Sequence, residues 1–198
     1  MRKKFKFKKL LNEYRALAQE LKYLNEVLVE ANKDFEIYHK EYCVQKDIDL
    51  AKLNLKHSEK VKEVFTNNTS LSKSVDKHSR QQEYDSKDLF RQIARKFHPD
   101  TLGFDDPNRD EYESVFKIAS SAIDNGDWGK LFDIVDRYDL DLKEYDSVNE
   151  CLRVDIKRTS LAVQNKKDSY AYLLYECEDN VNCKENVIKR FLKHLFNI

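Results

Sequence analysis

Both prolines and all three glycines of this 198-residue chain lie between residues 99 and 129. They are Pro99, Gly103, Pro107, Gly126 and Gly129. Proline and glycine are the residues least compatible with a helix interior, so little elsewhere in the sequence obliges a helix to stop. The distribution therefore predicts an all-α fold whose turns are concentrated in that one window.

The N-terminal region carries a long apolar repeat. Steps of four and three residues alternate from Leu10 to Tyr42, which is a heptad seam sustained over more than four heptads. Its leucines are Leu10, Leu17, Leu21, Leu24 and Leu28. The seam is typical of a coiled coil that forms a homo-oligomer or binds a client. A long helix packed on its own chain is the alternative, which the aromatic residues at the end of the seam favour.

A polar run, TNNTSLSKSVDKHSRQQE, follows at residues 66–83. It has little apolar periodicity and predicts a linker. We therefore expect an N-terminal helix or coiled coil over 1–65, then a linker over 66–83, then a compact helical domain.

Charge is balanced overall but unevenly distributed. Lysine and arginine total 36, as do aspartate and glutamate, whereas residues 101–155 carry 6 basic and 15 acidic side chains. Zero net charge argues against steering towards a polyanion. Residues 2–9 hold six basic side chains, for which we expect a frayed, solvated terminus; contact with an acidic surface, nucleic acid or a membrane face is the alternative.

A short amphipathic helix is expected from Lys87 to Phe97, with Asp85 or Ser86 as its N-cap. Its apolar stripe consists of Phe90, Ile93, Ala94 and Phe97, and its basic ridge consists of Lys87, Arg91 and Arg95. Pro99 disfavours helical geometry at the preceding residue, so the helix should end in an exposed corner formed by His98, Pro99 and Asp100.

Two more helices should follow this corner. One begins near Arg109 or Asp110 and stops at Asn125-Gly126, and Phe116 on it is a sensible partner for Phe90 across a hairpin. Asp127 can cap the other, from Trp128 to about Tyr138.

The segment FRQIARKFHPD, residues 90–100, with the helix that follows it, resembles the J-domain of Hsp70 co-chaperones. The resemblance covers residues 84–140. Phe116 and Ala122 match a further pattern of that family, whereas Gln92 stands where a basic residue is common. The usual first J helix is absent, as in truncated J-like proteins of bacteria and their phages.

The resemblance implies a non-enzymatic co-chaperone that binds a DnaK-type Hsp70 and stimulates its ATP hydrolysis. The residues implied in Hsp70 binding are His98, Pro99, Asp100, Lys87, Arg91, Arg95 and Lys96. The alternative is a structural or assembly coiled-coil protein, of the kind that phages encode, which keeps a J-like hairpin only as a scaffold.

Residues 141–198 should form a C-terminal helical hairpin. Asn182 with Glu185 gives a capping-box-like start to its last helix. We expect the hairpin to pack on the J-like part, in place of the missing helix; a partner-binding face is the alternative.

No catalytic, cofactor or metal-binding motif stands out. His39 and Cys43 share a helical face, but no second pair has ligand spacing. Four cysteines without a CxxC pair suggest reduced thiols, and no stretch approaches a membrane span. These features favour a cytoplasmic protein.

Overall fold

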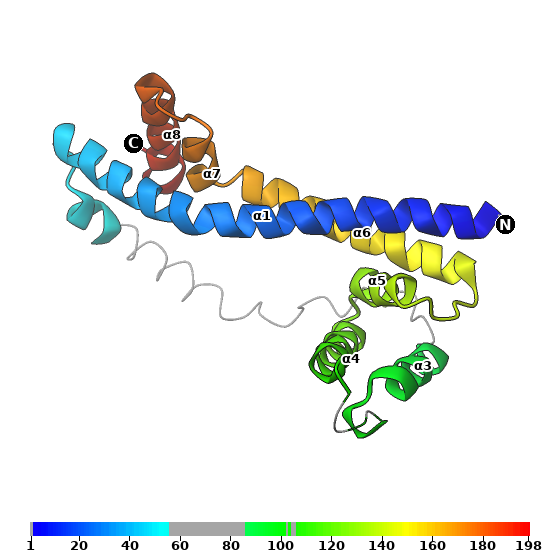
Figure 1. Cartoon of the computed structure of the whole chain (residues 1–198). Helices are drawn as coiled ribbons and strands as arrows, with labels where there is room; N and C mark the ends of the chain where they lie inside the picture. The colour runs from blue at the N-terminus through cyan, green and yellow to red at the C-terminus, as the bar shows by residue number, and fades with distance from the viewer. Residues whose placement is uncertain (1, 56–85, 102, 104–105) are drawn as a thin grey trace, which may run out of the picture. The chain divides into compact units, whose positions relative to one another are not determined.

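The computed structural model describes residues 2–55, 86–101, 103 and 106–198, and within these ranges it contains helices and no strand (Figure 1). The expected all-α class and long N-terminal helix are thus confirmed. The helices are α1 (Arg2–Gln45), α3 (Lys87–Phe97), the short 3₁₀ helix η1 (Pro99–Thr101), α4 (Arg109–Asp124), α5 (Trp128–Arg137), α6 (Tyr145–Lys167), α7 (Tyr170–Tyr175) and α8 (Val181–Phe196). The expected linker over 66–83 and residues 56–65 lie outside the described residues.

The chain divides into two compact units that differ from the expected domains. Unit 1 comprises Met1–Leu21 with Arg80–Ala162, and unit 2 comprises Lys22–Ser79 with Val163–Ile198. The N-terminal helix is therefore no separate domain, because each unit contains part of α1. Of the expected C-terminal hairpin, residues 163–198 belong to unit 2 with the second part of α1. The expected packing on residues 84–140 applies to the first part of α6, where Val148 and Leu152 are buried in the core of unit 1.

The α3–α4 hairpin and α5 form one end of unit 1, bounded as the breakers predicted. His98 ends α3 in an extended conformation (φ −66°, ψ 133°), as expected before a proline. Gly126 ends α4 with a φ of 62°. The N–H of Asp127 donates to the carbonyl of Ala122 at 2.7 Å and that of Gly126 to Ile123 at 3.1 Å. These bonds form a Schellman motif, which needs a left-handed residue and so favours glycine.

The first part of α1 completes the core of unit 1. Phe7, Leu11 and Tyr14 are buried with side chains of α3, α4, α5 and α6. The ring of Phe7 lies edge-on to those of Phe132 and Tyr145, at centroid distances of 6.4 and 5.8 Å. The first part of α1 therefore covers the apolar side of the helices that follow residue 86 in unit 1.

Ion pairs between α1 and the acidic helices surround this core. The guanidinium of Arg15 lies 2.6 Å from Asp133 and 3.0 Å from Asp136, while Lys8 also pairs with Asp136 and Lys3 with Asp146. These partners hold the pKa of Asp136 below its usual value, against the opposing effect of its burial. The basic N-terminus is thus helical from Arg2 and bound to its own chain's acidic surface, not a frayed end.

The N-terminus of α5 is capped from another helix. Asp127 precedes α5 but its side chain makes no capping hydrogen bond. Instead, the carboxylate of Asp155 on α6, fully buried, accepts the N–H of Gly129 at 2.7 Å and lies 3.0 Å from Arg158. Asp127 accepts a hydrogen bond from the Tyr14 hydroxyl at 3.1 Å and pairs with Lys130. Asp127, which was predicted to cap α5, therefore binds α1 through Tyr14 instead.

Unit 2 buries the second part of the seam within the chain. Leu28 and Ala31 of α1 pack with Ala171 of α7. Tyr42 and Cys43 pack with Leu174 and with the apolar face of α8, which includes Val187, Ile188 and Leu192. Leu24 is 1% exposed and Leu28 is 9% exposed. A heptad seam so covered cannot pair with another chain along these residues, which corrects the coiled-coil interpretation there and agrees with its alternative.

A disulfide joins Cys177 to Cys183, with their Cα atoms 5.6 Å apart, between α7 and α8. The expectation of four reduced thiols is therefore wrong for this pair, because the short turn brings together two cysteines six residues apart. Cys43 and Cys151 stay free and buried. The last helix begins two residues earlier than expected, since its N-cap is Asn180 and not Asn182; the side chain of Asn180 accepts the N–H of Cys183 at 3.1 Å.

Reduction of this disulfide is expected to destabilise unit 2 by about 2 kcal/mol, the loop-closure value for a loop this short. Thermal unfolding of the oxidised chain, with and without dithiothreitol, would measure the shift. The control is the Cys177→Ala/Cys183→Ala variant, which should not respond to the reductant. Equal unfolding temperatures for the oxidised and reduced wild-type chain would contradict the prediction.

Candidate partner-docking site

The site begins at the corner that ends α3. The ring of His98 is partly exposed, and its Nδ1 accepts the N–H of Asp100 at 3.2 Å. The hydroxyl of Thr101 donates to the carbonyl of His98 at 2.7 Å, and η1 adds a backbone bond there. These contacts fix the imidazole by one nitrogen, which leaves Nε2 as the nitrogen that can meet a partner. The side chain of Asp100 is 89% exposed.

Aromatic rings pack against His98 at this corner. The ring of Phe116 on α4 lies 4.9 Å from that of His98, edge to face, and 6.1 Å from that of Phe90. The predicted Phe90–Phe116 contact across the hairpin therefore exists. Phe90 is nevertheless 37% exposed, and Leu89 takes the buried place in the stripe with Ile93 and Phe97. The apolar stripe of α3 therefore begins at Leu89 and not, as predicted, at Phe90.

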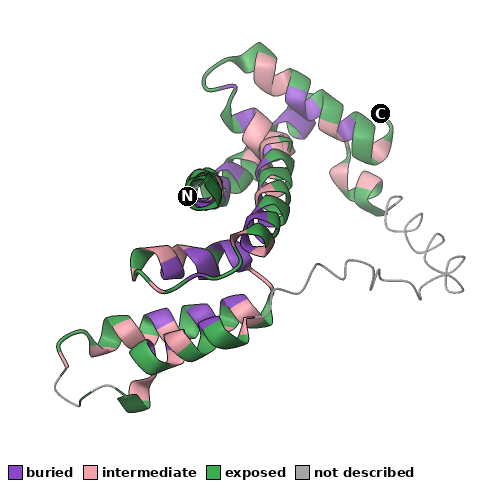
Figure 2. Ribbon diagram, turned by 90° about the vertical axis from the view of Figure 1, so that its right-hand side faces the viewer, coloured by how far each residue is buried: buried purple, intermediate pink, exposed green. Residues whose placement is uncertain are grey.

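The basic ridge lies on the exposed side of α3. At about 100° per residue, Lys87, Arg91, Arg95 and His98 fall within a sector of roughly 80°. This sector is opposite the buried positions Leu89, Ile93 and Phe97. Figure 2 shows the same division in the α3–α4 hairpin, with buried positions on one side and exposed positions on the other.

Two cations of this sector, Arg91 and Arg95, make no ion pair with residues 106–155, the described part of the acidic segment. Arg91 pairs at 3.3 Å with Asp88 of its own helix, and both side chains are about two-thirds exposed. Arg95 is exposed and makes no ion pair with any residue that the structure describes. An exposed pair such as Arg91–Asp88 costs little to break, so the side chains of Arg91 and Arg95 are accessible on this side of α3.

Lys96 differs from the other predicted cations because it binds inside unit 1. Its Nζ donates to the carbonyl of Tyr138 at 3.0 Å and lies 5.7 Å from the centres of the Phe97 and Tyr138 rings. Lys96 is therefore better described as an anchor for the end of α5 than as part of the docking face. This contact was not visible from helical spacing.

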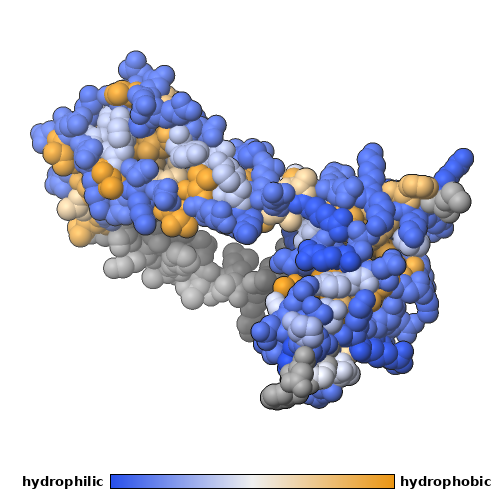
Figure 3. All heavy atoms as spheres, viewed as in Figure 1, coloured by the Kyte–Doolittle hydropathy of each residue, from blue (hydrophilic) through white to orange (hydrophobic). Residues whose placement is uncertain are grey.

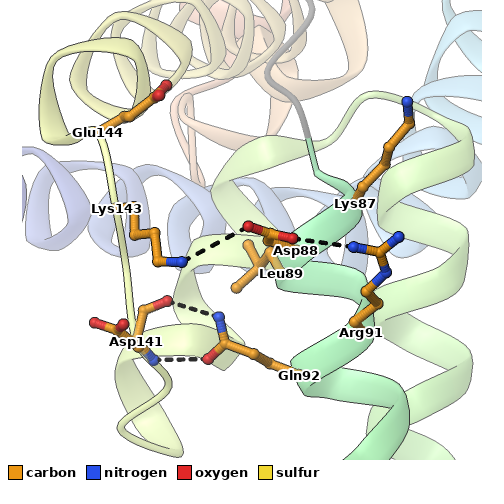
Figure 4. Close-up of a pocket in the computed structure, with 8 residues that line it drawn as sticks. All are labelled: Lys87, Asp88, Leu89, Arg91, Gln92, Asp141, Lys143 and Glu144. Carbon is orange, nitrogen blue, oxygen red and sulfur yellow. Dashed lines mark hydrogen bonds and ion pairs between the residues drawn. The ribbon is translucent and has the colours of Figure 1, made fainter.

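Gln92 makes a second anchor, which the sequence did not reveal. Its carboxamide donates to the carbonyl of Asp141 and accepts the N–H of the same residue, each at 3.0 Å (Figure 4). The carboxamide thus pairs with the backbone as a neighbouring strand would. The two anchors hold the segment between α5 and α6 along one flank of α3.

The surroundings of the site are polar. Hydrophilic side chains cover most of the face of unit 1 that is visible in Figure 3. Among the described residues, no group of three or more His, Cys, Asp or Glu side chains could hold a metal ion. His39 and Cys43 lie instead among the apolar contacts of unit 2, where burial lowers the pKa of His39 and raises that of Cys43.

Comparison with known proteins gives no relative. No protein-family model matches the chain, and no match is found among curated proteins or among solved structures. Within the described ranges, none of the helices combines the length and the apolar character that crossing a bilayer requires.

Proposed function

We propose that this protein is a J-type co-chaperone, which binds the ATP form of a DnaK-type Hsp70 and stimulates hydrolysis there. The observation that carries the proposal is the alignment of Lys87, Arg91, Arg95 and His98 along the exposed side of α3, opposite its buried stripe. An exposed histidine and aspartate stabilise this fold little, whereas a partner could desolvate and pair both.

The site acts by binding and not by chemistry. A row of cations gives complementarity to an acidic partner surface and speeds encounter with it. The corner would then bring Asp100 and the Nε2 of His98 against the partner, at positions fixed by Phe116 and Thr101. The work of hydrolysis belongs to the partner's own nucleotide site, so we propose no enzymatic activity for this chain.

The proposal includes a cytoplasmic location, where Hsp70 proteins of this type and ATP are both present. The Cys177–Cys183 bond would be open to reduction in that compartment. A client would bind elsewhere on the chain, and not through Leu24 or Leu28, which are buried.

The alternative is an assembly protein in which the J-like hairpin is only a scaffold. Its support was the loss of the first J helix and an N-terminal coil open to other chains. The burial of the seam in both units weakens the second of these arguments. Nucleic-acid binding through residues 2–9 is weakened in the same way, since Lys3 and Lys8 already pair with aspartates.

Single-turnover ATP hydrolysis by a bacterial Hsp70 tests the proposal. The wild-type chain is expected to raise the rate by about tenfold, within the usual range for coupling between sites. The His98→Gln variant should lose this stimulation. His194→Gln is the matched control, because it makes the same change at an exposed position of α8 in unit 2.

Circular dichroism of each variant would establish that it is folded. Stimulation that His98→Gln leaves unchanged would contradict the role of the corner. A folded wild-type chain that stimulates none of several Hsp70 proteins would overturn the proposed function.

A further inference from the structure

A notch lies beside the basic ridge of unit 1, between α3 and the segment that precedes α6 (Figure 4). Its volume is about 210 Å³. Arg91 lines it from α3 and Lys143 from the opposite wall, with Asp88 between them. Arg91 and Lys143 are 52 positions apart in the sequence, so only the fold brings them to one site.

We propose that Arg91 and Lys143 together receive an acidic side chain of the docking partner. In the free protein, Asp88 holds the place of this carboxylate, and Gln92 is the residue that positions Lys143. This inference rests on the proposed function and extends its docking surface beyond α3.

Asp88 has the geometry of a replaceable anion. Its Oδ1 lies 3.3 Å from Arg91 and its Oδ2 lies 3.7 Å from Lys143, so one carboxylate bridges both cations. All three side chains are between 65% and 68% exposed. Water screens such pairs and leaves them weak, so an incoming carboxylate can displace Asp88 at little cost. The same contact gains strength when a partner excludes water from it.

Gln92 explains why Lys143 stands at this position. Its two hydrogen bonds hold the backbone of Asp141, which lies two residues before Lys143. Asp141 and Lys143 are both exposed and flank the buried Leu142, so fixing the backbone of Asp141 also restricts the direction from which Lys143 approaches α3. Loss of these bonds would leave the lysine charge intact but free to move away from the notch.

The choice of partner chemistry follows from charge. The notch is lined by the cations Lys87, Arg91 and Lys143 and by the carboxylates Asp88, Asp141 and Glu144, and Asp88 is the carboxylate that bridges Arg91 and Lys143. A carboxylate of a partner protein can take the place of Asp88 between Arg91 and Lys143, whereas a basic or apolar surface cannot. The occupant is therefore an acidic side chain of the same Hsp70.

The test is the affinity of the full chain for the ATP form of a bacterial Hsp70 at low ionic strength. Lys143→Gln should weaken binding by about fivefold, a typical value for one interface charge pair. Asp88→Asn should strengthen it about twofold to fivefold, mainly through faster association. Both effects should fall as salt is added. The matched control is Lys189→Gln in unit 2, where a similarly exposed lysine pairs with Glu185.

Gln92→Ala separates positioning from direct contact. It should weaken binding in the wild-type background but have little further effect in the Lys143→Gln background, because the lysine it positions is then gone. Equal effects in both backgrounds would overturn the positioning role of Gln92.

The outcomes distinguish this inference from the function on which it rests. Wild-type binding that His98→Gln abolishes, with Lys143→Gln and Asp88→Asn both within twofold of wild type, would overturn the notch and leave the proposed function standing. If the Asp88→Asn variant binds the Hsp70 more weakly than wild type does, Asp88 does not occupy the position of the partner's carboxylate in the free protein. No binding by the wild-type chain would overturn both.

Discussion

The Gly129→Ala variant is expected to lose about 3 kcal/mol of the free energy of unfolding of unit 1, at the upper end for overpacking a core. A Cβ atom at this position would lie 2.3 Å from two ring carbons of Tyr14 and 2.6 Å from a third. Tyr14 is only 5% exposed and its hydroxyl is bonded to Asp127, so the ring has nowhere to move without breaking that bond. Urea unfolding followed by circular dichroism would measure the loss.

Two further variants make this prediction specific. Gly103→Ala is the matched control, because a Cβ there meets no atom within 4 Å, and its stability should stay within about 0.5 kcal/mol of wild type. In a Tyr14→Ala background, Gly129→Ala should instead increase the free energy of unfolding. The ring of Tyr14 is then absent, and alanine is favoured over glycine within a helix by about 1 kcal/mol. A Gly129→Ala chain as stable as wild type would show that α1 does not pack against α5 as described.

Removal of the Asp155 carboxylate is expected to have a similar effect. Asp155→Ala should destabilise unit 1 by about 3 kcal/mol, because it leaves the buried N–H of Gly129 without its acceptor and Arg158 without its nearest carboxylate. Asp155→Asn should lose much less, since the amide oxygen can still accept that N–H. The control is Asp146→Ala, which removes an exposed partner of Lys3 and should cost no more than about 1 kcal/mol.

The burial of Asp155 also leads us to expect that the stability of unit 1 depends on pH. Its burial is the largest effect on its pKa and raises the pKa above the usual aspartate value, although Gly129 and Arg158 oppose the shift. The folded chain therefore retains this proton at a pH where the unfolded chain has lost it. The stabilising contribution of the group is greatest at acid pH and is lost as the pH rises through the raised pKa.

A comparison of wild type with Asp155→Asn isolates this effect, because all the other carboxyl groups are the same in the two proteins. The stability of wild type relative to Asp155→Asn should increase as the pH is lowered from 7 to the ordinary aspartate pKa of about 4, measured by urea unfolding at each pH. A relative stability that decreases over this range would mean that the folded state favours the charged carboxylate.

Helix boundaries were predictable where a single residue decides them. Pro99 sets the end of α3 through its effect on His98, and Gly126 supplies the left-handed residue that ends α4. The period of the seam from Leu10 to Tyr42 correctly predicted a long N-terminal helix, which runs to Gln45. These features depend on a few neighbouring residues, which a sequence displays directly.

Pairing between distant segments was not predictable in the same way. The seam shows which side of α1 is apolar, but another chain and two parts of its own chain could cover it equally well. An acceptor for the Gly129 N–H was expected next to it, at Asp127, although a carboxylate 26 residues away provides it. Helical spacing likewise placed Lys96 on the docking face but could not show that the carbonyl of Tyr138 lies within its reach.

The contribution of α1 to unit 1 has a consequence for synthesis of the chain. Arg15 meets Asp133 and Asp136 across 118 and 121 positions, whereas α3, α4 and α5 pack among near neighbours. The hairpin can form early, but a ribosome adding about 5 to 20 residues per second needs on the order of ten seconds between the two ends of these pairs. Throughout that time Phe7, Leu11 and Tyr14 lack the surface that finally buries them, so the nascent chain is itself expected to need protection from aggregation.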